Sequence, residues 1–123
     1  MQTPTQRLGA LGERIAARWL RQHGWDILGE RVRVGRRDLD LIAHKDNTIA
    51  IIEVKTRRGD AFGGPVGAVG WQKQRQLVRG TREWLSRSGT MPGYIRFDVV
   101  GVLVQSASVR VCHVENAFQL PTS

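Results

Sequence analysis

The stretch from Asp38 to Lys55 constrains the fold most strongly, because it predicts two adjacent antiparallel strands joined by a short turn. Its first arm, residues 38–43, alternates imperfectly between polar and apolar side chains, whereas the second arm, residues 49–55, is rich in β-branched residues. Asp46 and Asn47 lie in the middle of the segment between the arms, and both are typical turn residues. We therefore predict a β-hairpin here.

Helical and strand-like patterns lie on both sides of this hairpin. The predicted elements are a helix over residues 7–23, a strand over 25–28, a polar connector or edge strand over 30–37, a glycine-rich loop over 56–70, a helix over 71–85, and strands over 94–104 and 109–114. This mixture of strands and helices indicates an α/β fold with a central mixed sheet flanked by helices. One domain over residues 1–123 is predicted, with its core at residues 7–115 and a frayed tail at 116–123.

The charge of the chain favours an anionic partner. Lys and Arg together number 19 against 11 acidic residues, which gives a formal net charge of +8. Sixteen of these cations are Arg, whose planar fork can bind a phosphate through two hydrogen bonds. Because Arg richness also follows from a GC-rich genome, the composition fits either nucleic-acid binding or a well-solvated basic surface.

Several classes of protein are excluded by what the sequence lacks. It has no apolar run near the roughly 20 residues that span a bilayer, and no secretory pattern at its N-terminus. A lone cysteine, Cys112, excludes an intramolecular disulfide and a zinc site made of cysteines. We therefore expect a cytoplasmic protein without a membrane segment or a structural metal.

The hairpin also predicts a pair of facing carboxylates. If the turn is centred on Asp46 and Asn47, Asp40 faces Glu53 on one side of the sheet, with Cβ atoms about 4.5–5.5 Å apart. Lys55 points to the same face, because strand side chains alternate. Like charges in this position destabilise a sheet, whereas a Mg²⁺ or Mn²⁺ ion between them would be well held by oxygen ligands. Such an ion would activate water for phosphodiester hydrolysis, with Lys55 stabilising the developing charge or helping to deprotonate the water.

A simpler interpretation fits part of the same pattern. Glu53 and Lys55 alone are equally typical of a solvated cross-strand ion pair. The functional interpretation is favoured by the conjunction of Asp40 at matching register with an apolar run around Glu53, where acids and a lysine are costly unless paired or used.

Cationic residues surround the predicted carboxylate site. They precede the first arm of the hairpin, follow its second arm or begin the next helix, so we expect them near one end of the sheet. There they would contact a nucleic-acid backbone, although each one fits a solvated polar loop as well. These residues are Arg33, Arg36, Arg37, Arg57, Arg58 and Lys73.

Several ordered motifs resemble a known family. GERIAARWL at residues 12–20, RRDLDLIAHKDNTIAIIEVKTR at 36–57 and RFDVV at 96–100 resemble the YraN-like family of bacterial proteins, as do Phe62-Gly63 and Lys73 between them. The resemblance covers residues 11–100, most of the chain. That family looks like a branch of the restriction-endonuclease-like (PD-(D/E)xK) superfamily and is similar to archaeal Holliday-junction resolvases. The likeness implies a restriction-endonuclease-like core with a central mixed sheet between helices.

The resemblance also implies roles for particular residues. Asp40 matches the motif aspartate, and residues 53–55 match the ExK motif. Glu13, on the first helix, matches an additional acid of the metal site. One departure is Arg37-Asp38, where the family usually has Gly-Glu, so that a bulky cation replaces a glycine close to the site.

Three functions are compatible with these patterns. The leading hypothesis is a nuclease dependent on Mg²⁺ or Mn²⁺ that hydrolyses DNA, for example branched or repair intermediates. The alternative is a nucleic-acid-binding module or accessory protein that has a nuclease-like fold without catalysis. A third is a basic structural protein whose acids form ion pairs. A homodimer fits the likeness to junction resolvases, although no sequence pattern identifies a dimer surface.

Two residues outside the hairpin carry separate expectations. Trp71, directly after the glycine-rich loop, is the aromatic residue most suited to stacking on a base. Asp98 shares a strand face with Arg96, which predicts an internal ion pair.

Overall fold

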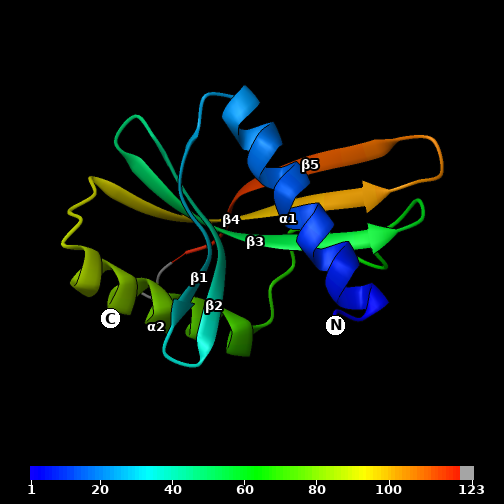
Figure 1. The fold of residues 1–123 in the computed structure, drawn as a ribbon. Coiled ribbons are helices and arrows are strands. Elements are labelled where there is room, and N and C mark those ends of the chain that lie inside the picture. Colours follow the sequence, from blue (N-terminus) through cyan, green and yellow to red (C-terminus); the bar gives the residue numbers. More distant parts are fainter. Residues whose placement is uncertain (120–123) are drawn as a thin grey trace.

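The computed structural model describes residues 1–119, which form one five-stranded sheet and two helices. The strands lie side by side in the order β1-β2-β3-β4-β5 (Figure 1). Neighbouring strands are antiparallel except for β3 and β4, which are parallel. The elements are α1 (Pro4–Gln22), β1 (Asp26–Val34), β2 (Arg37–Lys45), β3 (Thr48–Arg58), α2 (Trp71–Ser88), β4 (Tyr94–Val104) and β5 (Val109–Phe118). The predicted α/β fold is confirmed, and its architecture is consistent with a restriction-endonuclease-like core.

The parallel pair of strands determines where α2 must lie. A chain that leaves one end of β3 has to return to the opposite end of the sheet before β4 can begin. The glycine-rich loop and α2 make this crossover (Figure 1). Within residues 1–119, no helix is long and apolar enough to cross a membrane.

The register of the β2–β3 hairpin agrees with the sequence prediction. Lys45 pairs with Thr48, which leaves Asp46 and Asn47 as a two-residue turn. Asp46 has a φ of 54°, a left-handed conformation that Asp and Asn adopt more readily than most residues. The pairing continues to Leu41 and Ile52, so the next residues along the two strands are Asp40 and Glu53.

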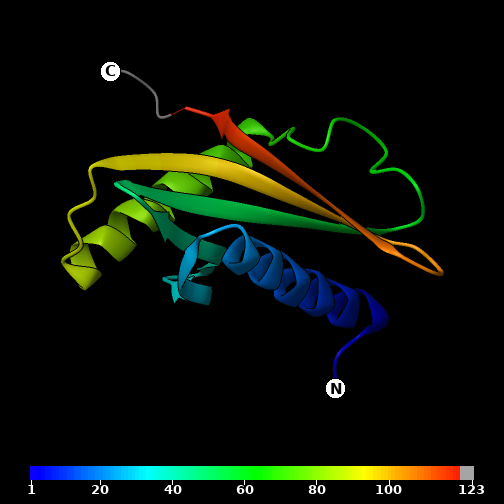
Figure 2. The same ribbon diagram turned by 90° about the horizontal axis from the view of Figure 1, so that it is seen from above.

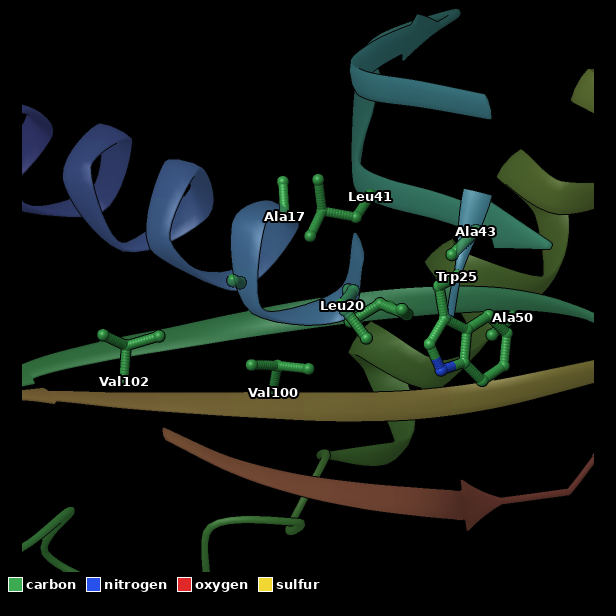
Figure 3. Close-up of a cluster of buried hydrophobic side chains, with 10 residues drawn as sticks. Ala17, Leu20, Trp25, Leu41, Ala43, Ala50, Val100 and Val102 are labelled. Atoms are coloured by element: carbon green, nitrogen blue, oxygen red, sulfur yellow. The ribbon is translucent and has the colours of Figure 1, made fainter. Parts of the chain in front are cut away.

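The two faces of the sheet pack against different helices (Figure 2). Side chains alternate along β3, so that Ile52 lies in the α1 layer and Ile51 in the α2 layer. Leu20 of α1 and the adjacent Trp25 fill the first layer (Figure 3), and Leu77 of α2 belongs to the second. Each fully buried Leu or Ile stabilises the fold by about 1.5–3 kcal/mol. The α1 layer also contains Ala16, Ala17, Leu41, Ala43, Ala50, Val100 and Val102.

Helix α1 begins three residues before the predicted start at residue 7. Thr3 caps it: the Thr3 side chain accepts the Gln6 backbone N–H, and the Gln6 side chain accepts the Thr3 N–H. Pro4 occupies the first turn, where its missing N–H costs nothing. These capping contacts extend the helix beyond its apolar stripe.

Strand β4 has the predicted bounds, whereas other strands are longer than predicted because tertiary pairing extends them. The predicted strand at 25–28 and the edge segment at 30–37 are largely one edge strand, β1. Strand β3 continues to Arg58, into the predicted loop, because Arg58 pairs with Val104. Strand β5 extends past residue 115 to Phe118, whose ring stacks on Phe97 at 4.6 Å. The remainder of the tail that was predicted to fray, residues 120–123, lies outside the described residues.

Gly12 is expected to be essential for the packing of α1 on β3. A Cβ at Gly12 would lie 1.8 Å from Oγ1 of the Thr56 side chain, so the helix would have to move. Gly12→Ala should therefore destabilise the protein by about 1–3 kcal/mol in urea unfolding, although Ala is the better helix former. Gly9→Ala is the control, because nothing lies within 4 Å of that position and a gain of about 0.5–1 kcal/mol is expected. Equal effects of the two substitutions would contradict this account.

Candidate carboxylate and lysine site

The carboxylates of Asp40 and Glu53 meet where β2 separates from β3. The described ladder between these strands ends at Leu41 and Ile52, one residue before the two acids. Beyond that point, Asp40 Oδ2 accepts the Val54 backbone N–H at 2.9 Å. A side-chain oxygen thus replaces the backbone acceptor that β2 would have supplied. Asp40 and Glu53 are brought together as the sequence predicts.

The proximity of the two acids changes the protonation of Asp40. Burial, followed by a hydrogen bond and charge repulsion from Glu53, raises the pKa of Asp40 from 3.8 to about 8. The Val54 N–H and the charge of Lys73 oppose this increase without cancelling it. The pair therefore favours a shared proton near neutral pH, and a cation placed between the carboxylates would displace that proton.

Two lysines lie close to Glu53. The Lys73 ammonium is 3.3 Å from Glu53 Oε2, whose side chain is only 14% exposed. Lys55 lies on the same face of β3 and donates a hydrogen bond to the backbone carbonyl of Ala68 in the glycine-rich loop. Lys55 and Lys73 both line one hollow of about 310 Å³, together with Glu53. A phosphate in this hollow would meet two lysines beside the Glu53 carboxylate.

Glu13 lies near this pair but has a partner of its own. Arg31 donates to both Glu13 oxygens, at 3.1–3.2 Å. Burial, and next the negative charge of Asp40, raise the pKa of Glu13, while Arg31 opposes the change. Among residues 1–119, no group of three or more Asp, Glu, His or Cys side chains is close enough together to hold a metal ion. The role of Glu13 as a third ligand therefore stays a prediction.

Only part of the predicted cationic rim lies at the site. Arg36, Arg37 and Lys73 line a hollow of about 450 Å³ together with Asp40, and Arg57 lines the adjoining hollow of Glu53. Lys73 borders both hollows and so connects them. Arg37, which departs from the family's glycine, is half-buried in this rim.

The other two predicted cations do not themselves line these hollows. Arg33 is 3.4 Å from Asp38, which lines the hollow of Asp40, so Arg33 is one ion pair away from it. Arg58 lines a different hollow with Gly59 and Asp60. A contact of either arginine with a nucleic-acid backbone stays a prediction.

Besides the Lys73–Glu53 ion pair, three contacts of the site were missed by the sequence interpretation. They are the Arg31 guanidinium on Glu13, the Val54 amide on Asp40 and the Ala68 carbonyl on Lys55. Arg31 has a φ of 48°, a conformation that its residue type does not predict. The other two are backbone groups, for which a side-chain pattern contains no signal.

The sequence of this chain matches a family of known proteins. The model of the Uncharacterised protein family UPF0102 matches residues 12–102. A UPF0102 protein from Alkaliphilus metalliredigens is 37% identical over 93% of this chain and 99% of the relative. One from Nocardia farcinica is 46% identical over 80% of this chain and 78% of the relative. A third, from Geobacter metallireducens, is 32% identical over 98% of both chains.

The chain belongs to the UPF0102 family. The predicted YraN-like resemblance is thereby confirmed. The part matched by the UPF0102 model contains Glu13, Asp40, Glu53, Lys55 and Lys73, whereas β5 lies beyond it. The whole candidate site is therefore built from the segment that defines UPF0102 membership.

Proposed function

We propose that this chain is a divalent-metal-dependent phosphodiesterase that cleaves DNA. The observation that carries the proposal is the partly buried pair of adjacent carboxylates, Asp40 and Glu53, with a lysine on the same strand face as Glu53. A fold gains nothing from two facing acids when burial, and next the contact with Glu53, raises the pKa of Asp40 to about 8. Destabilising arrangements of this kind cluster at functional sites.

The two carboxylates fit Mg²⁺ or Mn²⁺. Mg²⁺ commonly binds through one or two protein carboxylates and completes its shell with water and substrate phosphate, so a third acidic ligand is not required. Asp40 and Glu53 would hold the ion, with Glu13 as a candidate outer ligand through water. When bound, such an ion polarises a phosphoryl oxygen and lowers the pKa of its water.

The lysines supply the charge that phosphoryl chemistry needs. Lys55 shares a strand face with Glu53, where its ammonium would stabilise the negative charge that develops on the phosphoryl oxygens. In the structure, it donates to the neutral Ala68 carbonyl. A charged phosphate oxygen is a stronger acceptor than a carbonyl, so the substrate would displace this contact.

The surroundings of the pair support nucleic acid as the substrate class. Arg36, Arg37, Arg57 and Lys73 border the two connected hollows. A chain with repeated phosphates would neutralise several of these cations at once, and the net charge of +8 favours its approach. DNA is proposed through the likeness to junction resolvases.

A cleavage panel tests the proposal. Labelled flaps, four-way junctions, single strands and duplexes are incubated with Mn²⁺ or Mg²⁺, and the products are resolved on denaturing gels. We expect metal-dependent cleavage of at least one substrate, and a loss of roughly 100-fold or more with Asp40→Asn or Glu53→Gln.

Asp46→Asn is the matched control for these variants. It makes the same chemical change on the same hairpin, at the end remote from the site, and Asn tolerates the left-handed turn position. The control should cleave like the wild-type protein. Salt-dependent binding without cleavage of any substrate, unchanged by Glu53→Gln, would overturn the enzymatic proposal and support the non-catalytic binding module.

A further inference from the structure

A second cationic surface lies on the side of α2 away from the carboxylates. Arg75, Arg79 and Arg82 follow one another at helical spacing, so their exposed guanidinium groups form a stripe. They line a hollow of about 450 Å³ whose floor contains Val78 and Phe118. None of the residues that line this hollow is acidic, and none of the three arginines forms an ion pair within residues 1–119.

Trp71 stands at one end of this arginine groove. Its side chain is 63% exposed, although a large aromatic residue is usually buried. The Arg75 guanidinium lies over the indole ring, 5.1 Å from its centroid. Because Arg75 covers one face of the indole, a nucleobase can stack on the other face of the ring or on the outer side of the guanidinium.

We propose that the arginine groove (Trp71, Arg75, Val78, Arg79, Arg82 and Phe118) binds single-stranded nucleic acid. The arginines would contact successive phosphates, while Trp71 and the apolar floor would receive unpaired bases. A duplex presents phosphates but keeps its base faces stacked inside, so it could use the arginines without using Trp71. The combination of cationic rim and aromatic end therefore favours a single strand.

The groove connects with the carboxylate site at the first turn of α2. Gly70 borders the hollow that contains Glu53 and Lys55, and the next residue, Trp71, borders the arginine groove. From Trp71 to Arg82 the helix rises about 16 Å, enough for roughly four or five stacked nucleotides. A strand lying in the groove would thus enter the carboxylate site beside Trp71. This part of the inference rests on the proposed function, whereas binding in the groove does not.

Binding measured without divalent metal tests the groove separately from catalysis. The probes are labelled oligothymidine and oligouridine of roughly 12 nucleotides and a DNA duplex of equal length. Fluorescence anisotropy should show tighter binding of at least one single strand than of the duplex, and binding should quench tryptophan fluorescence. Because this binding is measured on the wild-type protein without metal, a failure of cleavage leaves the result intact.

Variants within the groove give the sharper comparison. Trp71→Ala should weaken single-strand binding about tenfold and abolish most of the fluorescence quenching. Arg79→Ala should reduce the slope of log affinity against log salt by about 0.7, the value for one lost phosphate contact on a single strand. The control is Arg110→Ala, which replaces an exposed arginine at the second position of β5, beside the β4–β5 turn. Figure 1 shows that turn far from α2, so the variant should leave the salt slope near the wild-type value.

Two results would overturn the inference. One is tighter binding of the duplex than of either single strand. The other is a Trp71→Ala variant with unchanged single-strand affinity and unchanged quenching, since a helix-end residue with no role in stacking would give that outcome.

Discussion

Asp40→Asn is expected to make the protein more stable than the wild type at pH 8, by on the order of 4 kcal/mol, while removing its proposed activity. Burial and the neighbouring Glu53 raise the pKa of Asp40 from 3.8 to about 8. Asn resembles the protonated acid: its carbonyl can accept the Val54 N–H, and its amide can donate to Glu53. The substitution therefore removes the repulsion and keeps the contacts.

The raised pKa of Asp40 also determines how the stability of the protein changes with pH. Between pH 3.8 and about 8 the folded state holds a proton on Asp40 that the unfolded state has lost, so stability falls as the pH rises through this range. Thermal unfolding in a chelator should show this fall for the wild-type protein. For Asp40→Asn the fall should be absent, and its Tm should exceed that of the wild type by roughly 15 °C at pH 8.

Two measurements, one with Mn²⁺ and one on a matched variant, check that ionisation of Asp40 beside Glu53 causes the loss of stability at high pH. Mn²⁺ should raise the Tm of the wild-type protein at pH 8 and leave that of Asp40→Asn unchanged, since the ion would bind the ionised pair. Asp46→Asn should follow the wild-type pH profile. A wild-type stability that stays constant between pH 4 and pH 8 would show that Asp40 is not perturbed as described.

Asp98→Ala is expected to have the opposite effect and to destabilise the protein by about 3–5 kcal/mol. The Asp98 side chain is fully buried and accepts hydrogen bonds from Arg96, from the His113 ring at 2.7 Å and from the Asn116 backbone N–H. Its loss would leave the Arg96 guanidinium without its buried partner between β4 and β5. Urea unfolding at neutral pH measures the change in free energy.

Glu115→Gln is the control for this prediction. Glu115 lies 3.5 Å from the same Arg96, but its side chain is 61% exposed, so its loss should cost no more than about 1 kcal/mol. Similar losses for Asp98→Ala and Glu115→Gln would contradict a special role of the buried acid. The predicted internal ion pair of Asp98 and Arg96 is confirmed by the structure, and His113 is an additional partner.

Asp98 and Asp40 are expected to affect the stability of the protein in different parts of the pH range. Burial alone would raise the pKa of Asp98, but the hydrogen bonds from His113 and Arg96 outweigh it and hold that pKa below its ordinary value of 3.8. The stability that Asp98 supplies is present above this pH and is lost on further acidification. Asp40 lowers stability progressively as the pH rises from 3.8 to about 8, so these two acids together should place the maximum of stability near the lower end of that range.

Much of the fold is encoded in short segments of the sequence. The turn residues Asp46 and Asn47 between two strand-like arms specify the register of the hairpin. That register is sufficient to place Asp40 opposite Glu53, because a slip of one residue would move every side chain to the other face. Local chemistry therefore predicted the central pair of the site.

The residues at which the strands end could not be predicted in the same way. Strand β3 extends to Arg58 because β4 lies beside it, and β5 extends to Phe118 because Phe97 stacks on that ring. These contacts join residues distant in sequence, so no local pattern reveals them. Helix α1 is the exception, since its Thr3–Gln6 capping pair is a local signal.

By itself, the sequence determined the mixed sheet between helices, the pairing of Asp40 with Glu53, and the face that Lys55 shares with them. Only the tertiary structure decided which charges surround that pair. It places Lys73 against Glu53, Arg31 on Glu13 and Arg58 at a different hollow. The physical reason is that strand pairing is directional and short-ranged, so residue type and spacing define it. Long charged side chains reach partners on separate elements, and the packing of the helices and the twist of the sheet determine which partners are in reach.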